Sequence, residues 1–363
     1  MSRAIKIFKL IYQLSLICIL ILVGYMIWLD FRVTSEFSGR KWDLPSHIYA
    51  RPLELFAGAA VSQTELVWEL EQLGYRRVSS AKSVGQFSIA DNRVQLFVRG
   101  FDFWDQNEEP RLLMVEFYGD QISTLRDAKY SPVGIARLEP LRIGGIFPEK
   151  VEDRIPVALG EVPPLLVATL IQVEDRAFFE HYGFSIRGII RSLLTNVAAG
   201  EIVGGGSTIT QQLVKNFFVG SEQRLSRKVN ELLMSMLLEF HYSKEEILET
   251  YLNEVFLGQS GDRAIHGFGM ASWHYFRQPL NEIGPEKIAL LVGMLKGPYT
   301  YNPWSKPDNA LDRRNLVLSL MANDNLIATE ELAALQENPL GQAARPLLSL
   351  NPFPGYMRLV RDE

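Results

Sequence analysis

Two polar stretches decide the fold and the chemistry of this chain: Glu174-Asp175-Arg176-Ala177-Phe178-Phe179-Glu180-His181 and Gly205-Gly206-Ser207-Thr208-Ile209-Thr210-Gln211-Gln212-Leu213-Val214-Lys215-Asn216. Their polar residues are too dense, and too closely spaced around apolar ones, for ordinary surface. They combine a carboxylate, a glycine-rich approach, hydroxyls, amides and a lysine. Chemistry on an anionic, oxygen-rich substrate requires such a set.

The second stretch is predicted to open a helix. Gly204-Gly205-Gly206 gives the backbone freedom at its entrance, and Ser207 or Thr208 can cap it. A helix N-terminus and a lysine can both bind phosphate. Two polar stripes share one side of this helix, because each joins residues one turn apart: Gln211 with Lys215, and Gln212 with Asn216. Taken alone, the glycine run is more simply interpreted as a plain loop.

A further polar group follows on the next predicted helix, which carries Arg227, Lys228 and Glu231. Arg227 and Glu231 are one turn apart, so an exposed i,i+4 salt bridge is the simpler interpretation of this group alone.

Composition bounds the class of protein. The chain has 363 residues, which allows one membrane segment and about two domains of ordinary size. A net charge of −5 argues against a general nucleic-acid binder. The only cysteine, Cys18, lies in an apolar run, so neither a disulfide framework nor a zinc site is predicted.

The N-terminal region predicts a single-pass membrane anchor. Residues 10–29 carry no charge and are long enough to cross a hydrocarbon core of roughly 30 Å as a helix. Lysine and arginine in residues 1–9 predict a cytoplasmic tail, with everything after Asp30 outside. A cleaved signal peptide is disfavoured, because the apolar run is too long and no small-x-small site follows it. Residues 30–45 are interpreted as a polar tether.

Residues 46–142 are predicted to form a small accessory domain of mixed α/β structure. Ser62-Gln63-Thr64-Glu65 is a capping box before a helix that stops at Gly74. Strand-like alternation follows over residues 94–98 and 113–117, with turns at Asp91-Asn92 and Gly119-Asp120. No catalytic set appears in this segment.

Residues 150–340 are predicted to form a predominantly α domain. Pro163 and Pro164 suit a helix start, and Ser185 can cap a helix that ends at Gly200. Ser243-Lys244-Glu245-Glu246 is a second capping box. Residues 311–321 form another amphipathic segment.

Together these residues resemble the glycosyltransferase family 51 domain of class A penicillin-binding proteins, the peptidoglycan polymerases. The family's five motifs have ordered counterparts over residues 174–321: Glu174-Asp175-Arg176 through Gly183; Gly205 to Asn216; Arg227-Lys228 through Glu231; Lys244 through Tyr251-Leu252-Asn253 and Gly258; and Arg313-Arg314 through Met321. Residues 46–142, Ser185 and Gly258-Gln259-Ser260-Gly261-Asp262 resemble the 1b type of this family.

The resemblance implies a membrane-anchored α+β protein with a lysozyme-like glycosyltransferase domain. It implies that lipid II is polymerised by inversion into β-1,4-linked glycan, with Glu174 as general base and undecaprenyl pyrophosphate as leaving group. Glu231 would assist the leaving-group side, with Mg²⁺ or Mn²⁺ as a candidate cation and no organic cofactor. The substrate-binding residues that it implies are Ser207, Thr208, Gln211, Gln212, Lys215, Asn216, Arg227 and Lys228.

The resemblance also implies a location and partners. The chain would sit in the bacterial inner membrane with its catalytic domain in the periplasm, bound to lipid II and the growing glycan strand. Residues 46–142 would dock an outer-membrane lipoprotein activator, and other cell-wall synthesis or division proteins are further candidate partners. No nucleic acid is expected, and moenomycin is expected to bind.

One departure from the family concerns the transpeptidase that bifunctional members carry. The sequence has no Lys-Thr-Gly, its Ser-x-x-Lys at Ser79 stands in isolation, and residues 341–363 resemble the start of the linker to that domain. We therefore expect this polypeptide not to acylate penicillin.

Two alternatives stay open. A lysozyme-like hydrolase needs a carboxyl group of raised pKa. Several cations near a glutamate would lower its pKa, which argues against that role. A non-catalytic membrane scaffold that docks cell-wall partners is the second alternative, although both Glu174 and Glu231 are present.

Overall fold

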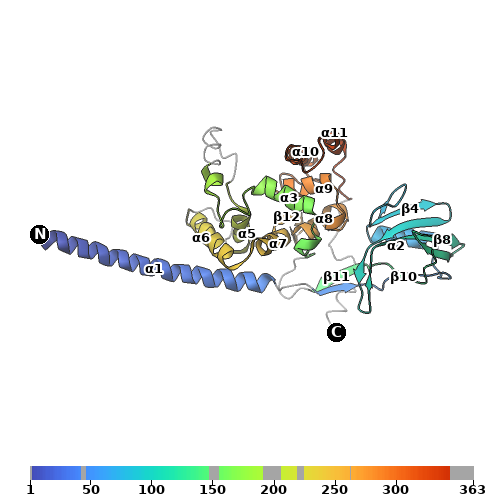
Figure 1. The fold of residues 1–363 in the computed structure, drawn as a ribbon, viewed down its shortest axis with the longest axis horizontal. Helices are drawn as coiled ribbons and strands as arrows, with labels where there is room; N and C mark the ends of the chain where they lie inside the picture. Colours follow the sequence, from blue (N-terminus) through green and yellow to red (C-terminus); the bar gives the residue numbers. More distant parts are fainter. Residues whose placement is uncertain are drawn as a thin grey trace.

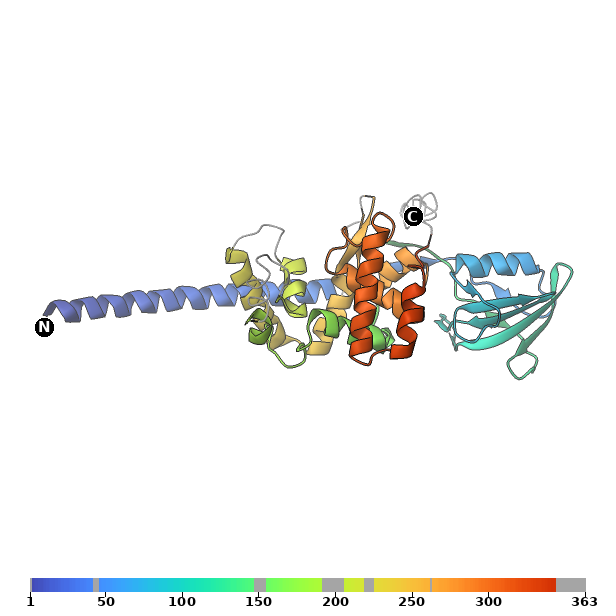
Figure 2. The same ribbon diagram turned by 90° about the horizontal axis from the view of Figure 1, so that it is seen from above.

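The computed structural model describes residues 2–41, 46–146, 155–190, 206–218, 225–261 and 263–343. Its architecture is mixed α+β and rich in helices, as predicted. A long N-terminal helix runs along a helical domain and projects beyond it, and a β-rich domain lies at the opposite end of the molecule (Figures 1 and 2).

The N-terminal helix α1 (Ser2–Lys41) is longer than the predicted anchor. Among the described residues, Tyr12–Ser38 is the one helical stretch whose length and composition suffice to cross a membrane. The prediction of a tether over residues 30–45 was wrong, because residues 30–41 continue the helix. Leu29, Val33 and Phe37 recur every fourth residue, and this stripe is buried in the core of the helical domain.

Polar contacts hold the same part of α1. The Asp30 carboxylate pairs with His241 at 2.6 Å, and the Tyr25 hydroxyl donates to Asn230 Oδ1 at 2.7 Å. His241 ends helix α6 (Leu225–His241), against which α1 packs.

The accessory domain is built on a five-stranded sheet with the order β3-β4-β5-β8-β9. Its strands are β3 (Arg76–Arg77), β4 (Gln86–Ala90), β5 (Arg93–Val98), β8 (Arg111–Tyr118) and β9 (Gln121–Asp127). The predicted turns are confirmed: Asp91 (φ 50°) joins β4 to β5, and Gly119 (φ 58°) joins β8 to β9.

Helix α2 (Gln63–Gln72) begins at the predicted capping box, where the Ser62 hydroxyl accepts from the Glu65 N–H. Leu66 and Leu70 join the buried cluster of the domain, which also contains Phe87, Leu96, Leu113 and Val115. Two short ladders accompany the sheet, β2 (Glu54–Leu55) with β10 (Ala136–Arg137) and β6 (Phe101–Asp102) with β7 (Asn107–Glu108).

The two ends of the accessory domain meet in one ladder. Strand β1 (Ser46–Tyr49) pairs antiparallel with β11 (Arg142–Ile146), so that Ser46 lies opposite Ile146. The chain therefore enters and leaves this domain at the same place, next to the helical domain.

The described part of the helical domain contains α3 (Pro164–Glu174), α5 (Ile209–Phe218), α6, α7 (Lys244–Glu254), α8 (Phe268–Phe276), α9 (Pro285–Met294), α10 (Pro307–Asn323) and α11 (Thr329–Glu337), with a hairpin of β12 (Phe256–Ser260) and β13 (Arg263–His266). Helices α3, α5, α6, α7 and α10 coincide with predicted helices, whereas α8, α9 and α11 were not predicted. The predicted helix start at Pro163-Pro164 and the Ser243 capping box are both present. Of the helix expected from Ser185, residues 186–190 are helical, and its remainder to Gly200 lies outside the described residues.

A buried ion pair joins the two domains. Arg99 of the accessory domain contacts Glu282 of the helical domain and bonds Glu139 at 2.7 Å. The Tyr75 ring lies under the guanidinium at 4.3 Å, and its hydroxyl donates to Glu139 at 2.9 Å. Gly74 allows this close approach, because a Cβ there would lie 2.4 Å from the Arg277 carbonyl oxygen.

Replacing Arg99 should therefore cost stability. Arg99→Met leaves the buried Glu139 and Glu282 carboxylates without their cation, and we expect a loss of about 3–5 kcal/mol in equilibrium urea unfolding. Arg93→Met is the matched control, because its pair with Glu116 is exposed and should contribute below about 1 kcal/mol. Equal losses in the two variants would contradict a stabilising role of the interdomain pair.

Candidate active site

The predicted catalytic glutamate lies at the end of a helix. Glu174 is the last residue of α3, and Asp175 caps the C-terminal end of that helix. Glu174, Ser207 and Thr208 line one pocket of about 140 Å³. Residues of the first two polar stretches thus line the same pocket.

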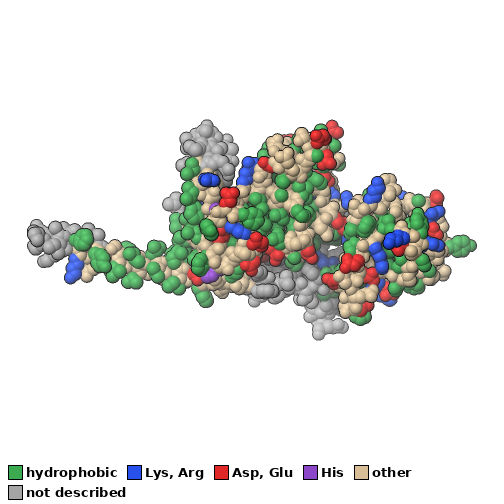
Figure 3. Space-filling view, viewed as in Figure 1, with side chains coloured by type: hydrophobic (Ala, Val, Ile, Leu, Met, Phe, Trp, Pro, Cys, Tyr) green, Lys and Arg blue, Asp and Glu red, His purple; other side chains and the backbone are tan. Residues whose placement is uncertain are grey.

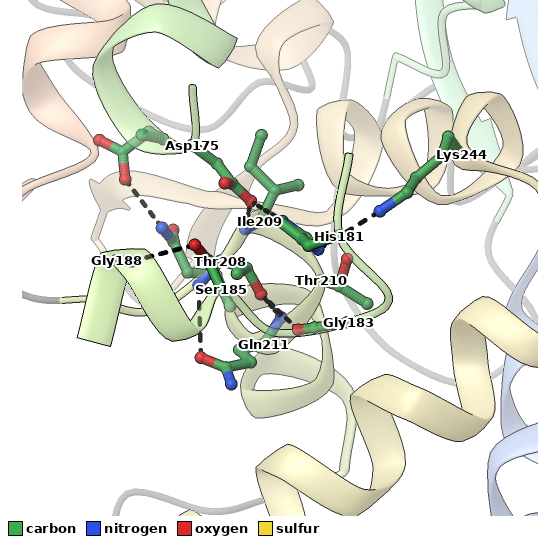
Figure 4. Close-up of polar contacts among 12 residues, drawn as sticks. Asp175, His181, Gly183, Ser185, Gly188, Thr208, Ile209, Thr210, Gln211 and Lys244 are labelled. Carbon is green, nitrogen blue, oxygen red and sulfur yellow. Dashed lines mark hydrogen bonds and ion pairs between the residues drawn. The ribbon is translucent and has the colours of Figure 1, made fainter. Parts of the chain in front are cut away.

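The start of α5 is fixed by a capping box. The Thr208 hydroxyl accepts from the Gln211 N–H at 3.2 Å, and Gln211 Oε1 accepts from the Thr208 N–H at 3.3 Å. The same hydroxyl donates to the Gly183 carbonyl at 2.7 Å, which ties the two motifs together (Figure 4). Gly183 has φ +85°, and a Cβ there would lie 2.6 Å from the Ser235 backbone, so only glycine fits.

Asp175 links the end of α3 to the start of α5. Its Oδ2 accepts from the Ile209 N–H at 3.0 Å and bonds His181 Nε2 at 2.9 Å (Figure 4). A carboxylate at a helix N-terminus is favoured by the helix dipole. Asp175 is 8% exposed, so these bonds form in a poorly solvated environment.

A second charged layer lies behind His181. Lys244 pairs with Glu239 at 2.7 Å, and its ammonium lies 3.5 Å from His181 Nδ1. The Thr210 hydroxyl donates to Glu239 at 2.6 Å. This layer holds the imidazole between Asp175 and the Lys244–Glu239 pair.

Glu174 itself is held by an amide. Gln212 Nε2 donates to Glu174 Oε2 at 2.8 Å, and the Tyr251 hydroxyl donates to Gln212 Oε1 at 2.8 Å. Burial raises the pKa of Glu174, against the opposing effects of the Gln212 hydrogen bond and the Arg313 charge, while the Asp175 charge raises it further. The prediction that cations would lower this pKa was wrong, because desolvation has the larger effect.

A second charged group lies on α6, where two cationic side chains surround the Glu231 carboxylate. This carboxylate bonds Lys228 Nζ at 2.9 Å and lies 3.4 Å from Arg227 Nε. Glu231 is only 2% exposed, so the interpretation as an exposed salt bridge was wrong. Lys228 Nζ also bonds the Ser207 hydroxyl at 2.8 Å, which connects this group to the pocket of Glu174.

The remaining predicted residues divide into two groups. Gln211 is 3% exposed, and its side chain is used within the capping box. Lys215 and Asn216 are exposed on the second half of α5, about one turn beyond Gln211 and Gln212. Gly204 and Gly205 lie outside the described residues.

Several supporting residues received no role from the sequence, although they stand in the quoted motifs: Asp175, His181, Lys244, Tyr251 and Arg313. The described residues contain no group of three or more His, Cys, Asp or Glu placed to hold a metal ion. A divalent ion stays a prediction.

Comparison with known proteins identifies two families. Residues 142–322 match the transglycosylase family, and residues 55–138 match the family described as the bifunctional transglycosylase second domain. The chain therefore belongs to the transglycosylase family.

Its relatives include penicillin-binding proteins 1B from three organisms. The protein of Escherichia coli (strain K12) is 41% identical, over 97% of this chain and 42% of the relative. Those of Haemophilus influenzae and Vibrio cholerae are 39% and 40% identical, over 100% and 92% of this chain and 46% and 43% of the relatives. The chain thus spans less than half the length of these proteins.

Removing the Asp175 carboxylate should destabilise the helical domain. Asp175→Ala leaves the Ile209 and His181 N–H groups buried without an acceptor, and we expect a loss of at least about 2 kcal/mol in equilibrium unfolding. Asp127→Ala is the matched control, because Asp127 also accepts from two backbone N–H groups, of Lys129 and Ser131, but in an exposed loop where water can replace it. A loss no greater than in the control would contradict the role of Asp175 in linking the end of α3 to the start of α5.

Proposed function

We propose that this chain is a peptidoglycan glycosyltransferase that polymerises lipid II into β-1,4-linked glycan strands and releases undecaprenyl pyrophosphate. One observation carries the proposal. The match to the transglycosylase family contains a pocket in which Glu174 lies beside the start of α5, and Lys228 connects that pocket to Glu231.

Glu174 acts as the general base. Its Oε2 is held by Gln212, and among the described residues no hydrogen bond reaches Oε1. Oε1 accepts the proton of the acceptor 4-hydroxyl as that oxygen attacks the donor C1. The pKa of Glu174 is raised toward neutral pH, and a general base is most effective when its pKa lies near the operating pH.

The leaving pyrophosphate is stabilised as an anion. The bond from C1 to the phosphate oxygen breaks with inversion, and the electron pair departs with the pyrophosphate, which needs charge neutralisation far more than a proton. Lys228 and Arg227 supply that neutralisation, and Lys215 extends it along α5. Glu231 holds the two cations in place.

A lysozyme-like hydrolase is the second candidate, and the raised pKa of Glu174 favours it, because a general acid needs such a carboxyl. A hydrolase also needs a second available carboxylate. Asp175 is bonded to Ile209 and His181, and Glu231 is paired with cations. The transferase accounts for these cations, whereas the hydrolase does not.

The chain is anchored in the bacterial inner membrane through α1, with the helical domain on the periplasmic side. Exposed apolar side chains gather along α1 and on the neighbouring edge of the helical domain (Figure 3). The exposed apolar side chains of the helical domain include Ile186, Ile189, Ile190, Val229 and Phe240. Such a surface suits contact with lipid, where the prenyl chain of the donor resides.

The accessory domain docks a periplasmic partner, for which an outer-membrane lipoprotein activator is the candidate. Its match to the bifunctional transglycosylase second domain and the 93% exposed Trp104 between β6 and β7 support this role. An exposed tryptophan is a frequent anchor of protein interfaces.

The function is tested with purified lipid II. In detergent, the wild-type chain should form long, lysozyme-sensitive glycan without a penicillin adduct, and Glu174→Gln should abolish this activity because it removes the base. Glu180→Gln, an exposed glutamate six residues away, should keep it. Shortening of preformed glycan, with no polymer formed from lipid II, would show that the chain is a hydrolase and not a transferase.

The same variant has a stability readout. Because the folded pKa of Glu174 is raised, its ionisation costs folded-state stability above that pKa and costs nothing below the unfolded pKa. Glu174→Gln should therefore unfold at an equal or higher temperature than wild type at pH 8.

Docking is tested by replacing Trp104. Trp104→Ala should spare basal polymerisation and reduce its stimulation by an added lipoprotein activator at least about tenfold in apparent affinity. Trp68→Ala, an exposed tryptophan on helix α2, serves as the control. Full stimulation of Trp104→Ala would show that the partner does not dock on the β6–β7 hairpin.

A further inference from the structure

A residue of helix α7 is connected to the candidate base, Glu174, by hydrogen bonds through the side-chain amide of Gln212. Tyr251 lies on this helix and is fully buried, and its hydroxyl donates to Gln212 Oε1 at 2.8 Å. The Nε2 atom of the same amide donates to Glu174 Oε2 at 2.8 Å. A continuous chain of donors thus runs from the core to the catalytic carboxylate.

The direction of this chain depends on how the Gln212 amide is turned. A glutamine side chain presents either its NH₂ group or its oxygen to a neighbour, and only the NH₂ group can bond a carboxylate. If the amide were reversed, its oxygen would face the Glu174 oxygen without a proton between them. The Tyr251 hydroxyl favours the productive orientation, because in that orientation it donates to the amide oxygen.

The other side of α7 is also fixed. Glu249 accepts from the Leu159 N–H at 2.8 Å, and Asn253 bonds both the N–H and the carbonyl of Val157, at 2.8 and 2.9 Å. The helix is therefore held between residues 157–159 and the amide of Gln212. This support leaves Tyr251 little freedom to follow a shifted amide.

We propose that Tyr251 is a positioning residue for glycosyl transfer, which orients the Gln212 amide so that Glu174 keeps one oxygen bonded and offers the other to the acceptor hydroxyl. The proposal rests on the proposed function in so far as Glu174 is the base. Burial raises the pKa of Tyr251 well above its ordinary value, so the hydroxyl keeps its proton throughout the range of the assay.

A tyrosine that only fills the core would behave differently. Loss of its hydroxyl would lower stability and would leave the ionisation of Glu174 unchanged. A positioning tyrosine also controls how well the Gln212 hydrogen bond stabilises the Glu174 anion. The two roles are therefore separated by the pH dependence of activity.

The experiment compares Tyr251→Phe with wild type in the full chain, assaying lipid II polymerisation in detergent between pH 5 and pH 9. We expect kcat to fall with KM unchanged, and the acid limb of the pH profile to move upward by about one pH unit, a tenfold loss on that limb. Gln212→Ala should produce a similar shift, and adding Tyr251→Phe to it should have little further effect on that limb.

Tyr275→Phe is the matched control. Tyr275 is also fully buried, and its hydroxyl donates to the Leu257 carbonyl at 3.0 Å rather than to Gln212. It should lose comparable stability and keep the wild-type acid limb. An unmoved limb in Tyr251→Phe, or the same limb in both tyrosine variants, would overturn the proposal.

A second readout does not depend on turnover. The carboxyl pKa of Glu174, followed by ¹³C NMR and assigned by its loss in Glu174→Gln, should rise in Tyr251→Phe and stay unchanged in Tyr275→Phe. An inactive wild type would refute the proposed function, while this titration would still decide the link from Tyr251 to Glu174. A titration unchanged by Tyr251→Phe would refute that link.

Discussion

The joint between the end of α3 and the start of α5 is the constraint on which the site depends. Asp175 accepts hydrogen bonds from Ile209 and His181, and Thr208 donates to the Gly183 carbonyl. The bonds of Asp175 with Ile209 and of Thr208 with Gly183 join residues more than 20 positions apart in the chain. Without them neither Glu174 nor the first turn of α5 would have a fixed place around the pocket.

The two glutamates of the site lie in different electrostatic surroundings. Glu174 is surrounded by few charges, so desolvation dominates and its pKa rises. Glu231 is nearly inaccessible but has Lys228 and Arg227 beside it. One environment favours accepting a proton, and the other keeps cations in place where negative charge develops. Two identical side chains thereby obtain different chemistry from their surroundings.

The sequence predicted local structure more accurately than it predicted which residues are buried. The capping boxes at Ser62 and Ser243 and the turns at Asp91 and Gly119 depend on neighbouring residues, and all of them are present. The five motifs also identified the residues that surround the site. By contrast, the burial of Glu231 and the desolvation of Glu174 depend on segments distant in the chain, which periodicity does not reveal. The helical course of residues 30–41 was missed for the same reason: their apolar stripe acquires a meaning only against α5 and α6.

Helix α1 shows how one segment can serve two environments. Leu29, Val33 and Phe37 belong to the stretch long enough to cross a membrane, yet they are buried in the core that also contains α5 and α6. A helix shared in this way cannot move relative to the domain without exposing that core. In the proposed anchored form, the catalytic pocket therefore stays at a fixed height above the bilayer. A fixed height suits a substrate whose reacting bond lies at a constant distance from its lipid chain.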